Sequence, residues 1–371
     1  MKIIHVTKSS LDKNALNGVN KIISQLCPFL NKIDNISSEV WALTNKKTKP
    51  FTSFDMFFFS KRKFPFHLSK QLVSQLNILK NDTIFHFHSV FIPEFYTISK
   101  ILDEKKIQWI ISPHGGYSND SFKKNYFLKS LYFFSFENFL LKKSKYILIN
   151  NLNEKKNSIK LNIFKKKIKI IPNGIPINKI RYNKKTSDVL NIIYVGRLSI
   201  MHKGLDLLIN SLKILSKLNI YPKLSIYGDG KDRNQLLKML NRLDPKIKIN
   251  LLRSVTGHQK YKKILNSDIF IHSSRWEGMP MAVLEAASLS KPLIISKETN
   301  LSNYVKKYEC GYVIEKLNSY SIAKVIQQAI KDKKKGRLNA LGQNSKKMTI
   351  IEFNWSKISK EMVYQLYNKV K

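Results

Sequence analysis

The sequence predicts an α/β fold made of two doubly wound domains, each built on a parallel sheet. Short apolar runs typical of buried strands alternate with amphipathic helical stretches along the whole chain. The alternation restarts near residue 191, after a polar and basic stretch, and 371 residues are enough for two domains. Because strands that alternate with helices form parallel sheets covered by helices, we expect the same architecture in both halves.

In the first half, two strand ends carry residues suited to ligand binding. Gly18 follows the first strand and a polar loop, opens a helix, and permits close approach of the backbone to a bound group; a simple turn is the alternative. His114 is followed by two glycines directly after the strand Trp109–Ser112, at the sheet edge where open α/β sheets bind ligands. The expected strands are 3–6, 40–43, 83–90, 109–112 and 146–150.

Three other features of the first half allow two interpretations each. His86 and His88 lie two apart on one strand and so share a face, but a metal site would need further ligands, and none is visible nearby in the sequence. The aromatic and basic segment Phe57–Phe66 is either an edge strand with a turn or a membrane-surface segment. The helix expected over Phe122–Lys143 packs on the sheet, with an exposed side that could rest on a membrane.

The second half repeats the strand–loop–helix pattern, and its first loop carries two cations. Arg197 follows the strand Asn191–Val195 and a glycine, while Lys203 precedes a helix. A polyanion would bind at this end of a strand, although one lysine at a helix start is ordinary in so basic a chain. Gly228 and Gly230 end the next strand. The remaining expected elements are strands at 224–227, 247–252, 269–271, 292–296 and 311–314, and helices at 205–218, 232–243, 259–266, 280–289, 321–331 and 356–371.

Residues 268–289 carry most of the candidate chemistry. Glu285 lies on a strongly apolar helix entered at Pro280, so we expect its carboxylate to be buried, and no basic residue lies within one turn to pair with it. Ligand hydroxyls would suit it, because one carboxylate can accept two hydrogen bonds from adjacent hydroxyls. The alternative is a core helix whose glutamate bonds a neighbouring backbone group. In the preceding turn, Gly278 follows Glu277 and lets the backbone approach closely, and the helix start offers N–H groups to an anion.

Composition narrows the class of protein. The formal charge is +41, but only eight of the 66 basic residues are arginine, and the Lys/Asn/Ile bias is what an AT-rich coding sequence would produce. We therefore expect attraction to anionic surfaces, including acidic lipid, rather than nucleic-acid binding. Cys27 and Cys310 have no metal-ligand spacing, and the N-terminus lacks an apolar signal region. We expect a cytoplasmic protein, peripheral on the cytoplasmic face of the inner membrane.

Together these stretches resemble the retaining glycosyltransferases of family 4, also called group 1. The resemblance covers nearly the whole chain and implies the GT-B fold, in which two Rossmann-like domains face each other across a cleft. It implies an acceptor-binding domain at 1–178, a linker at 179–190 and a nucleotide-sugar domain at 191–355, with the helix 356–371 packing back on the first domain. It is carried by Pro172-Asn173-Gly174, Val195-Gly196-Arg197-Leu198, Lys203-Gly204, Glu277 and Glu285 with seven residues between them, Gly278, Pro280, Ala286 and Gly311.

The resemblance also implies a role for each candidate residue. Arg197 and Lys203 would grip the donor diphosphate, Glu277 and His114 would lie beside the transferred sugar, and Glu285 would bind the ribose hydroxyls. The backbone N–H groups of Gly278, Met279 and Met281 would assist, whereas Pro280 has none. Gly18 would let the first loop close over the phosphates. Gly228 and Gly230 would lie near the base. Two cations and a helix N-terminus would stabilise charge on the leaving diphosphate, so neither a metal nor another cofactor is expected.

We therefore expect an enzyme, a retaining and metal-independent hexosyltransferase. It would move a sugar from a nucleotide-diphosphate-sugar donor to a glycan or lipid-linked glycan acceptor in bacterial O-antigen, capsule or lipopolysaccharide synthesis. Two other functions stay open. A sugar-nucleotide epimerase of the same fold would turn over without an acceptor, and a non-enzymatic polyanion-binding protein would depend on the net charge alone.

Overall fold

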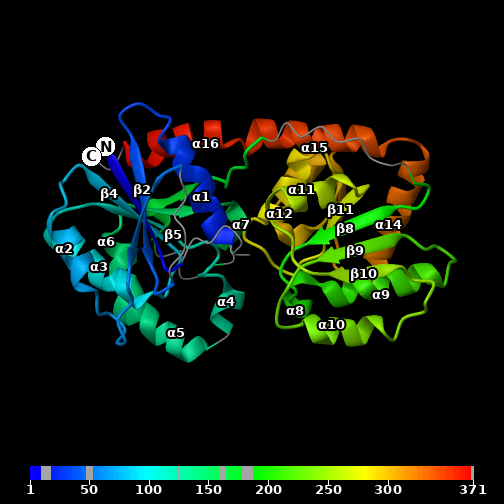
Figure 1. The fold of residues 1–371 in the computed structure, drawn as a ribbon, viewed down its shortest axis with the longest axis horizontal. Helices are drawn as coiled ribbons and strands as arrows, with labels where there is room; N and C mark the ends of the chain where they lie inside the picture. The colour runs from blue at the N-terminus through cyan, green and yellow to red at the C-terminus, as the bar shows by residue number, and fades with distance from the viewer. Residues whose placement is uncertain are drawn as a thin grey trace. The chain divides into compact units, whose positions relative to one another are not determined.

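The computed structural model describes residues 1–9, 18–46, 53–123, 125–156, 158, 164–177 and 187–368. The chain divides into two compact units, Met1–Gly174 with Trp355–Lys371, and Ile175–Asn354 (Figure 1). It passes from the first unit to the second after Gly174 and returns after Asn354. Of the expected linker, residues 179–186 lie outside the described ranges.

The first unit is built on a seven-stranded sheet in the order β3-β2-β1-β4-β5-β6-β7, with every neighbouring pair parallel. Five of the six residues of β1 and all six of β4 are buried, as expected for strands covered on both faces. The expected edge strand appears as β3. The strands are β1 Lys2–Thr7, β2 Ser37–Leu43, β3 Asp55–Phe59, β4 Thr83–His88, β5 Trp109–Ser112, β6 Tyr146–Ile149 and β7 Ile168–Ile170.

Helices pack on both faces of this sheet. On one face, Ile4 and Val6 of β1 belong to a core shared with the helices that follow β3, β4 and β5, while on the other Ile23 and Cys27 of α1 pack on Val40. The helices are α1 Gly18–Leu30, α2 Lys70–Asn77, α3 Pro93–Glu104, α4 Asn119–Lys123, α5 Tyr126–Tyr132, α6 Asn138–Lys143 and α7 Leu152–Lys156, with a π-helical turn η1 at Phe133–Glu137.

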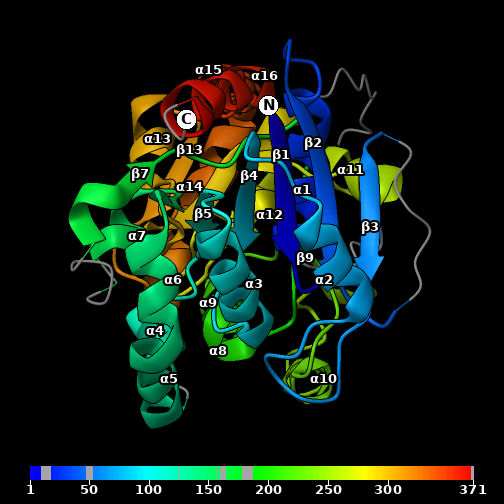
Figure 2. The ribbon, with the colours of Figure 1, turned by 90° about the vertical axis from the view of Figure 1, so that its left-hand side faces the viewer.

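The prediction of one continuous helix over Phe122–Lys143 is wrong. Asn125 adopts a left-handed conformation with φ of 64°, which an α-helix cannot contain, so α5 starts after it. The π-helical turn then separates α5 from α6. Figure 2 shows α4 and α5 extending away from the sheet, which leaves α5 without buried residues.

The C-terminal segment packs on the first unit. It consists of α16 Trp355–Met362 and a π-helical turn, η4 Val363–Tyr367, and α16 lies beside α1 (Figure 1). The indole of Trp355 donates to Gln25 Oε1 at 3.3 Å and covers Gly174, where a side chain would collide with the ring. The hydroxyl of Tyr367 bonds His86 Nδ1 at 2.8 Å.

The second unit repeats the architecture with a six-stranded parallel sheet in the order β10-β9-β8-β11-β12-β13. The prediction of two doubly wound parallel sheets is therefore confirmed. Its strands are β8 Asn191–Val195, β9 Lys223–Tyr227, β10 Ile249–Leu252, β11 Ile269–His272, β12 Leu293–Ser296 and β13 Gly311–Ile314. Its helices are α8 Ile200–Lys203, α9 Leu205–Ser216, α10 Arg233–Leu240, α11 Gly257–Leu265, α12 Met281–Ser288, α13 Ser302–Lys307, α14 Ser319–Lys334 and α15 Leu338–Glu352, with the 3-10 turn η3 at Lys297–Thr299. None of the helices in the described ranges is long and apolar enough to cross a bilayer.

Candidate functional site

The loop after β8 is held by the two glycines that follow β9. A Cβ atom on Gly228 would lie 2.0 Å from Gly196 O, and one on Gly230 would lie 2.3 Å from Leu198 O. The two loops also share a hydrogen bond from Leu198 N to Asp229 O at 2.9 Å. Close backbone packing therefore explains why both positions are glycine, and it fixes the loop that carries the exposed Arg197.

A third glycine brings Lys203 to the end of β11. Gly204 terminates α8 in a left-handed conformation with φ of 60°, and a Cβ there would lie 2.1 Å from Ser273 O. The Ser273 hydroxyl in turn donates to Lys203 O at 3.1 Å. Lys203 is consequently buried rather than extended into solvent, and its ammonium group bonds Glu277 Oε1.

Glu277 accepts three hydrogen bonds at one carboxylate oxygen, Oε1. The donors are the Lys203 ammonium, His272 Nε2 at 2.9 Å and the Ser274 hydroxyl at 2.8 Å. Burial opposes the charged form, but the His272 hydrogen bond and the Lys203 charge outweigh it and hold the pKa of Glu277 well below its usual value. Glu277 is therefore an anion at neutral pH, and its second oxygen, Oε2, accepts no recorded hydrogen bond within the described chain.

Sheet topology places this pair where ligands bind. Strand order runs outward in one direction from β8 and in the other from β11, so the two adjacent strands form the topological switch point of the second sheet. Lys203 follows β8, and Glu277 follows β11. Crevices outside the carboxyl ends of strands at such a point are the usual ligand sites of open α/β sheets.

The turn before α12 is fixed by Asn300, a residue that no local sequence pattern indicates. The amide of Asn300 donates to Glu277 O at 2.5 Å and to Gly278 O at 3.0 Å. The side chains of Met279 and Met281 are buried, so a ligand at this turn could meet only their backbone. Pro280 is the residue that precedes the first turn of α12, in an extended conformation, as expected for a proline at a helix start.

Glu285 is buried, as predicted, but its partner is a lysine of the protein. Lys260 of α11 places its Nζ 2.8 Å from the carboxylate, whose residue is only 1% exposed. A search within one turn of the helix could not reveal this lysine, because it comes from another helix; a bond from Glu285 to ligand hydroxyls stays a prediction. Burial of Glu285 by itself does not require a ligand.

In the first unit, His114 occupies a strained position at the end of β5. Its φ of 50° lies in the left-handed region, and the following residue, Gly115, has φ of 78°. Gly115 N donates to Glu154 Oε1 at 2.7 Å, which holds the turn. Strain of this kind at a strand end is characteristic of functional sites. Gly18 opens α1 and is exposed. Among the described residues no atom lies within 4 Å of a hypothetical Cβ there, so packing against them does not demand a glycine.

The structure places a third histidine beside His86 and His88. His5 of β1 joins them, and one nitrogen from each ring lies within 4.8 Å of the others. The further ligand that the sequence did not reveal is therefore present, because β1 and β4 are neighbours in register. Hydrogen bonds already use five of the six ring nitrogens of these histidines, however. His86 bonds Ser112 Oγ at 2.7 Å as well as Tyr367, and His5 Nδ1 lies 2.9 Å from His88 Nε2. The donor set fits a hydrogen-bonded cluster better than a metal centre.

The sequence thus predicted the main charged residues but not the residues that support them. The second unit brings Lys203 and Glu277 into contact and carries Arg197 on a neighbouring loop, while His114 and Gly18 belong to the first unit. The residues it missed are His272, Ser274, Asn300 and Lys260. His272 and Ser274 could have been found from their place at the end of an apolar strand, but Asn300 and Lys260 come from other elements and leave no local signal.

Two family models match successive parts of the chain. Residues 177–348 match the glycosyl transferases group 1, and residues 16–179 match glycosyltransferase family 4. An uncharacterized glycosyltransferase of Methanocaldococcus jannaschii is 29% identical over 300 residues, which cover 74% of this chain and 68% of the relative. The UDP-Gal:alpha-D-GlcNAc-diphosphoundecaprenol alpha-1,3-galactosyltransferase of Escherichia coli is 29% identical over 201 residues, 51% of each protein, so the chain spans about half of that relative.

Solved structures agree on the fold. The complex of Anabaena HepE with UDP superposes with a TM-score of 0.74 over 99% of this chain and 100% of that one, at 15% identity, which supports the two Rossmann-like domains of the GT-B fold. Together the two matched family models run from residue 16 to residue 348. The chain belongs to family 4, or group 1, of the glycosyltransferases, and it is an enzyme that transfers a sugar from a nucleotide-sugar donor.

Proposed function

We propose that the protein is a retaining glycosyltransferase that moves a hexose from a UDP-sugar to a lipid-linked glycan in bacterial surface-polysaccharide synthesis. The observation that carries the donor half of this proposal is the buried Lys203–Glu277 pair at the switch point of the second sheet. Buried charges are costly, so a charged pair at a ligand-binding edge is more readily explained by a site than by stability.

The proposed chemistry follows from the charges. Cleavage of the bond between sugar and phosphate leaves negative charge on the departing diphosphate. Arg197, on an exposed loop, and Lys203 would neutralise that charge, and Glu277 would accept hydrogen bonds from sugar hydroxyls at Oε2. Two fixed cations can supply the electrostatic stabilisation that a metal ion provides elsewhere, so we propose a metal-independent reaction.

Relatives suggest uridine as the donor base. The E. coli relative is named for a UDP-galactose donor, and the Anabaena structure contains UDP. A thermal-shift screen of UDP, GDP, ADP and CMP with and without Mg²⁺ tests the proposal, because a ligand that binds only the folded state raises the melting temperature. We expect UDP to stabilise the protein equally well in EDTA and to lose most of this effect in Glu285→Gln. A protein that responds to no nucleotide would favour polyanion binding instead.

Product analysis tests transfer and stereochemistry together. We expect turnover of the UDP-sugar to require an acceptor, and proton NMR of the product to show the anomeric configuration of the donor. Release of a free or epimerised sugar without acceptor would support the epimerase. An inverted product would exclude the retaining reaction.

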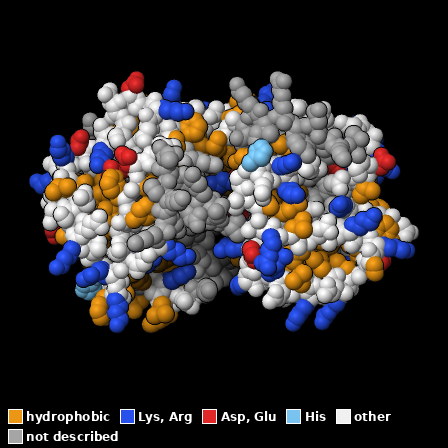
Figure 3. Space-filling model, viewed as in Figure 1, with side chains coloured by type: hydrophobic (Ala, Val, Ile, Leu, Met, Phe, Trp, Pro, Cys, Tyr) orange, Lys and Arg blue, Asp and Glu red, His pale blue; other side chains and the backbone are white. Residues whose placement is uncertain are grey.

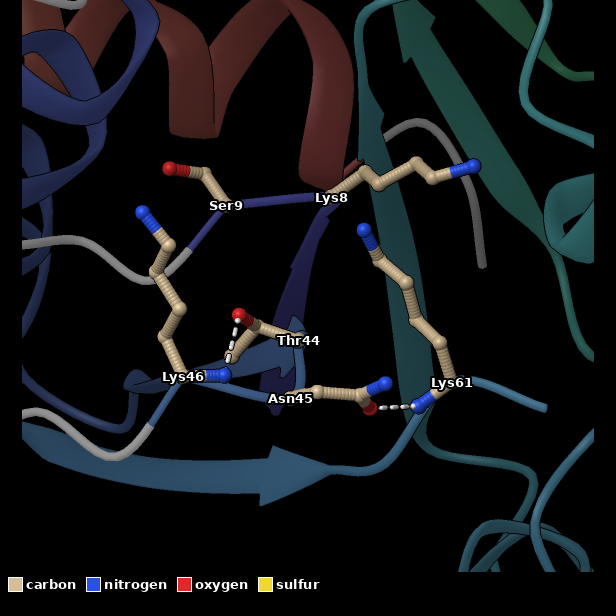
Figure 4. A pocket seen from close by; sticks show the side chains of 6 residues that line it. All are labelled: Lys8, Ser9, Thr44, Asn45, Lys46 and Lys61. Carbon is tan, nitrogen blue, oxygen red and sulfur yellow. Dashed lines mark hydrogen bonds between the residues drawn. The ribbon is translucent and has the colours of Figure 1, made fainter. Parts of the chain in front are cut away.

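The first unit holds a lysine-lined cavity that suits a phosphate-bearing acceptor. Its volume is about 390 Å³, and it is lined by Lys8, Ser9, Thr44, Asn45, Lys46 and Lys61. Figure 4 shows the side chains of Lys46 and Lys61 reaching toward the Lys8–Ser9 segment. Burial, and then the nearby Lys8 charge, lower the pKa of Lys61, although Glu94 pairs with Lys8 at 3.4 Å. An anion such as the diphosphate of a lipid-linked glycan would relieve this repulsion.

A kinetic comparison tests that assignment. Lys46→Gln with Lys61→Gln removes two of the three positive charges, so we expect KM for a diphosphate-linked acceptor to rise about tenfold, as for the loss of a charge-assisted hydrogen bond. The affinity for UDP should not change. Lys106→Gln, at an exposed lysine just after α3, is the matched control. An unchanged KM for the acceptor would refute the cavity's role.

An exposed apolar surface on the first unit supports contact with a membrane. It is formed by α5 and the start of η1, and Figure 3 shows apolar side chains at the lower edge of this unit, where Figure 1 places α5. Phe127 at its centre is 78% exposed. With a chain charge of +41, an anionic lipid surface is the natural partner. The exposed residues are Tyr126, Phe127, Leu128, Leu131 and Phe134.

Vesicle flotation tests this surface. Phe127→Ser with Leu131→Ser should release the protein from vesicles containing phosphatidylglycerol while leaving its melting temperature unchanged, because neither side chain is buried. Tyr320→Ser, an equally exposed aromatic on α14 of the second unit, should keep binding. Retention of the double variant on vesicles would assign membrane contact to another surface.

A further inference from the structure

Three histidines, one within β1, one at the end of β4 and one just after β5, form one chain of hydrogen bonds in the first unit. His5 Nδ1 lies 2.9 Å from His88 Nε2, and His88 Nδ1 lies 3.0 Å from His114 Nε2. The rings of His88 and His114 are nearly parallel, 14° apart. His5 and His88 are fully enclosed, whereas His114 is partly exposed. The chain therefore leads from the interior to a single accessible ring.

All three rings are neutral at physiological pH. Burial lowers the pKa of His5 to about 3 and that of His114 to about 4, and it lowers the pKa of His88 well below its usual value. A neutral imidazole has one N–H donor and one bare acceptor nitrogen, so the direction of one hydrogen bond fixes the direction of the next. The whole chain consequently has only two arrangements.

The unpartnered ends distinguish the two arrangements. His5 Nε2 and His114 Nδ1 are buried atoms that have no hydrogen-bond partner among the described residues. If the bonds ran inward, the surplus N–H would be sealed at His5 Nε2, where no ligand can reach it. If they run outward, His5 Nε2 is a bare acceptor and the surplus N–H lies on His114 Nδ1, an atom that is also covered but belongs to a partly exposed ring in a loop. An unpartnered donor is the costlier defect where the whole ring is enclosed, as at His5, so the outward arrangement is favoured.

We infer that His5 and His88 are positioning residues, which hold His114 in the Nδ1–H tautomer so that it donates a hydrogen bond to an oxygen of the bound sugar. This inference rests on the proposed place of His114 beside the transferred sugar. The backbone supports it, because His114 is fixed in a left-handed turn by Gly115 N, which donates to Glu154. A strained backbone and an oriented ring both restrict where the donor points.

His86 offers a control within the same cluster. It lies two residues from His88 on β4 and stacks on it with ring centroids 4.3 Å apart, but its nitrogens bond Ser112 and Tyr367 and stand outside the chain. A change at His86 therefore disturbs packing next to His88 without interrupting the line of hydrogen bonds. A structural effect and a tautomer effect can be separated on this basis.

The experiment is long-range ¹H–¹⁵N correlation NMR on full-length protein labelled with ¹⁵N-histidine, because the two nitrogen shifts report the tautomer of each neutral ring. With eight histidines in the chain, His114 is assigned by His114→Asn. We expect His114 to carry its proton on Nδ1. A wild-type His114 protonated on Nε2 overturns the inference without any variant, as does stoichiometric loss of the His5, His86 and His88 signals on addition of Zn²⁺ alone, which would identify a metal site.

Two amide variants sharpen the test. The amide of His88→Asn occupies roughly the place of Nδ1 and can still donate to His114, whereas that of His88→Gln occupies the place of Nε2 and cannot. We expect His88→Gln to shift His114 toward the Nε2–H form and to lower kcat about tenfold, less than the loss of a direct transition-state donor. His88→Asn and His86→Gln should keep the wild-type tautomer. An unchanged tautomer in His88→Gln would contradict the inference.

The outcomes separate this inference from the proposed function. The affinity for UDP, which we assign to the second unit, should be unchanged in His88→Gln, so the loss falls on kcat. Normal transfer by His114→Asn would refute the catalytic place of His114, while the wild-type NMR spectrum would still decide the tautomer. Loss of UDP binding in His88→Gln would indicate general damage, and the assignment of His88 as a positioning residue would then fail.

Discussion

The two units place polar clusters at equivalent positions, the carboxyl ends of central parallel strands, but they satisfy them in opposite ways. In the second unit, buried charges are paired, with Lys203 on Glu277 and Lys260 on Glu285. In the first unit, burial keeps His5, His88 and His114 neutral and hydrogen-bonded. The difference suits different tasks: fixed charge binds and stabilises an anion, while a neutral ring donates a directed hydrogen bond.

The largest effect should come from removing one half of a buried charge pair. Lys260→Met leaves the Glu285 carboxylate without its cation, and an uncompensated buried charge costs about 3–5 kcal/mol of folding free energy. Urea unfolding of the purified protein measures it. Adding Glu285→Gln should restore most of the loss, since no charge is then stranded. Lys306→Met, which breaks an exposed pair with Glu315, should cost at most about 1 kcal/mol. Equal losses in both lysine variants would show that burial is irrelevant here.

The positive charge of Arg197 in the second unit should increase the rate of sugar transfer rather than the stability of the fold. Arg197→Ala removes a cation from the exposed loop after β8, so we expect kcat to fall about 100- to 1000-fold with little change in melting temperature. Steady-state kinetics with saturating donor and acceptor measure this. Arg337→Ala, on an exposed residue paired with Asp332, is the matched control and should be near normal. Wild-type turnover by Arg197→Ala would remove that residue from the site.

Alanine substitution of the glycines assigned to the donor site should affect stability in the second unit but not in the first. Gly228→Ala forces a methyl group against Gly196 O and should destabilise the protein by about 1–3 kcal/mol, as overpacking does. Gly18→Ala meets no atom of the described residues within 4 Å and should leave stability unchanged. Thermal unfolding compares the two. A stable Gly228→Ala protein would mean that the two loops can separate, which would weaken the packing explanation for Gly228.

The units should also respond to acid in different pH ranges. Folded pKa values of about 3 for His5 and 4 for His114 lie below the unfolded value of 6.5, so the unfolded chain takes up these protons first. The folding free energy that the neutral histidines contribute is fully present above pH 6.5. It decreases as the pH drops toward 4, by up to about 1.4 kcal/mol per pH unit for each histidine. Glu277 affects stability at lower pH. Because its pKa is depressed in the folded protein, its contribution to folding stability is present above pH 4.5 and is lost as the pH falls through the folded pKa.

Tryptophan fluorescence during urea unfolding can follow this difference. Three tryptophans, Trp41, Trp109 and Trp355, are buried in the first unit, whereas Trp276 belongs to the second. In a Trp276→Phe variant the signal therefore reports the first unit alone. We expect the urea concentration at the unfolding midpoint of this unit to decrease as the pH is lowered from 6.5 to 4. His5→Phe should make this decrease smaller. A midpoint that is constant down to pH 4.5 would contradict the neutral cluster.

Sequence by itself determined the architecture and the main charged positions. Strand and helix periods recur in both halves, and parallel strands align their carboxyl ends, so the sequence alone places residues that follow strands at one sheet edge. Arg197, Lys203, Glu277 and His114 were predicted as site residues in this way. Helix continuity was less predictable at Asn125: asparagine adopts the left-handed conformation more readily than most residues, but it also occurs within helices, so its presence alone does not mark a break.

Only the tertiary structure decided how those residues are partnered. Lys260 reaches Glu285 from another helix, Asn300 holds the turn after Glu277 from a later loop, and His5 joins His88 across 83 residues. A sequence shows spacing along the chain, whereas hydrogen bonds and ion pairs depend on separation in space. The register of β1 against β4, set by packing of the whole sheet, aligns His5 with His86 and turns separate histidines into one cluster.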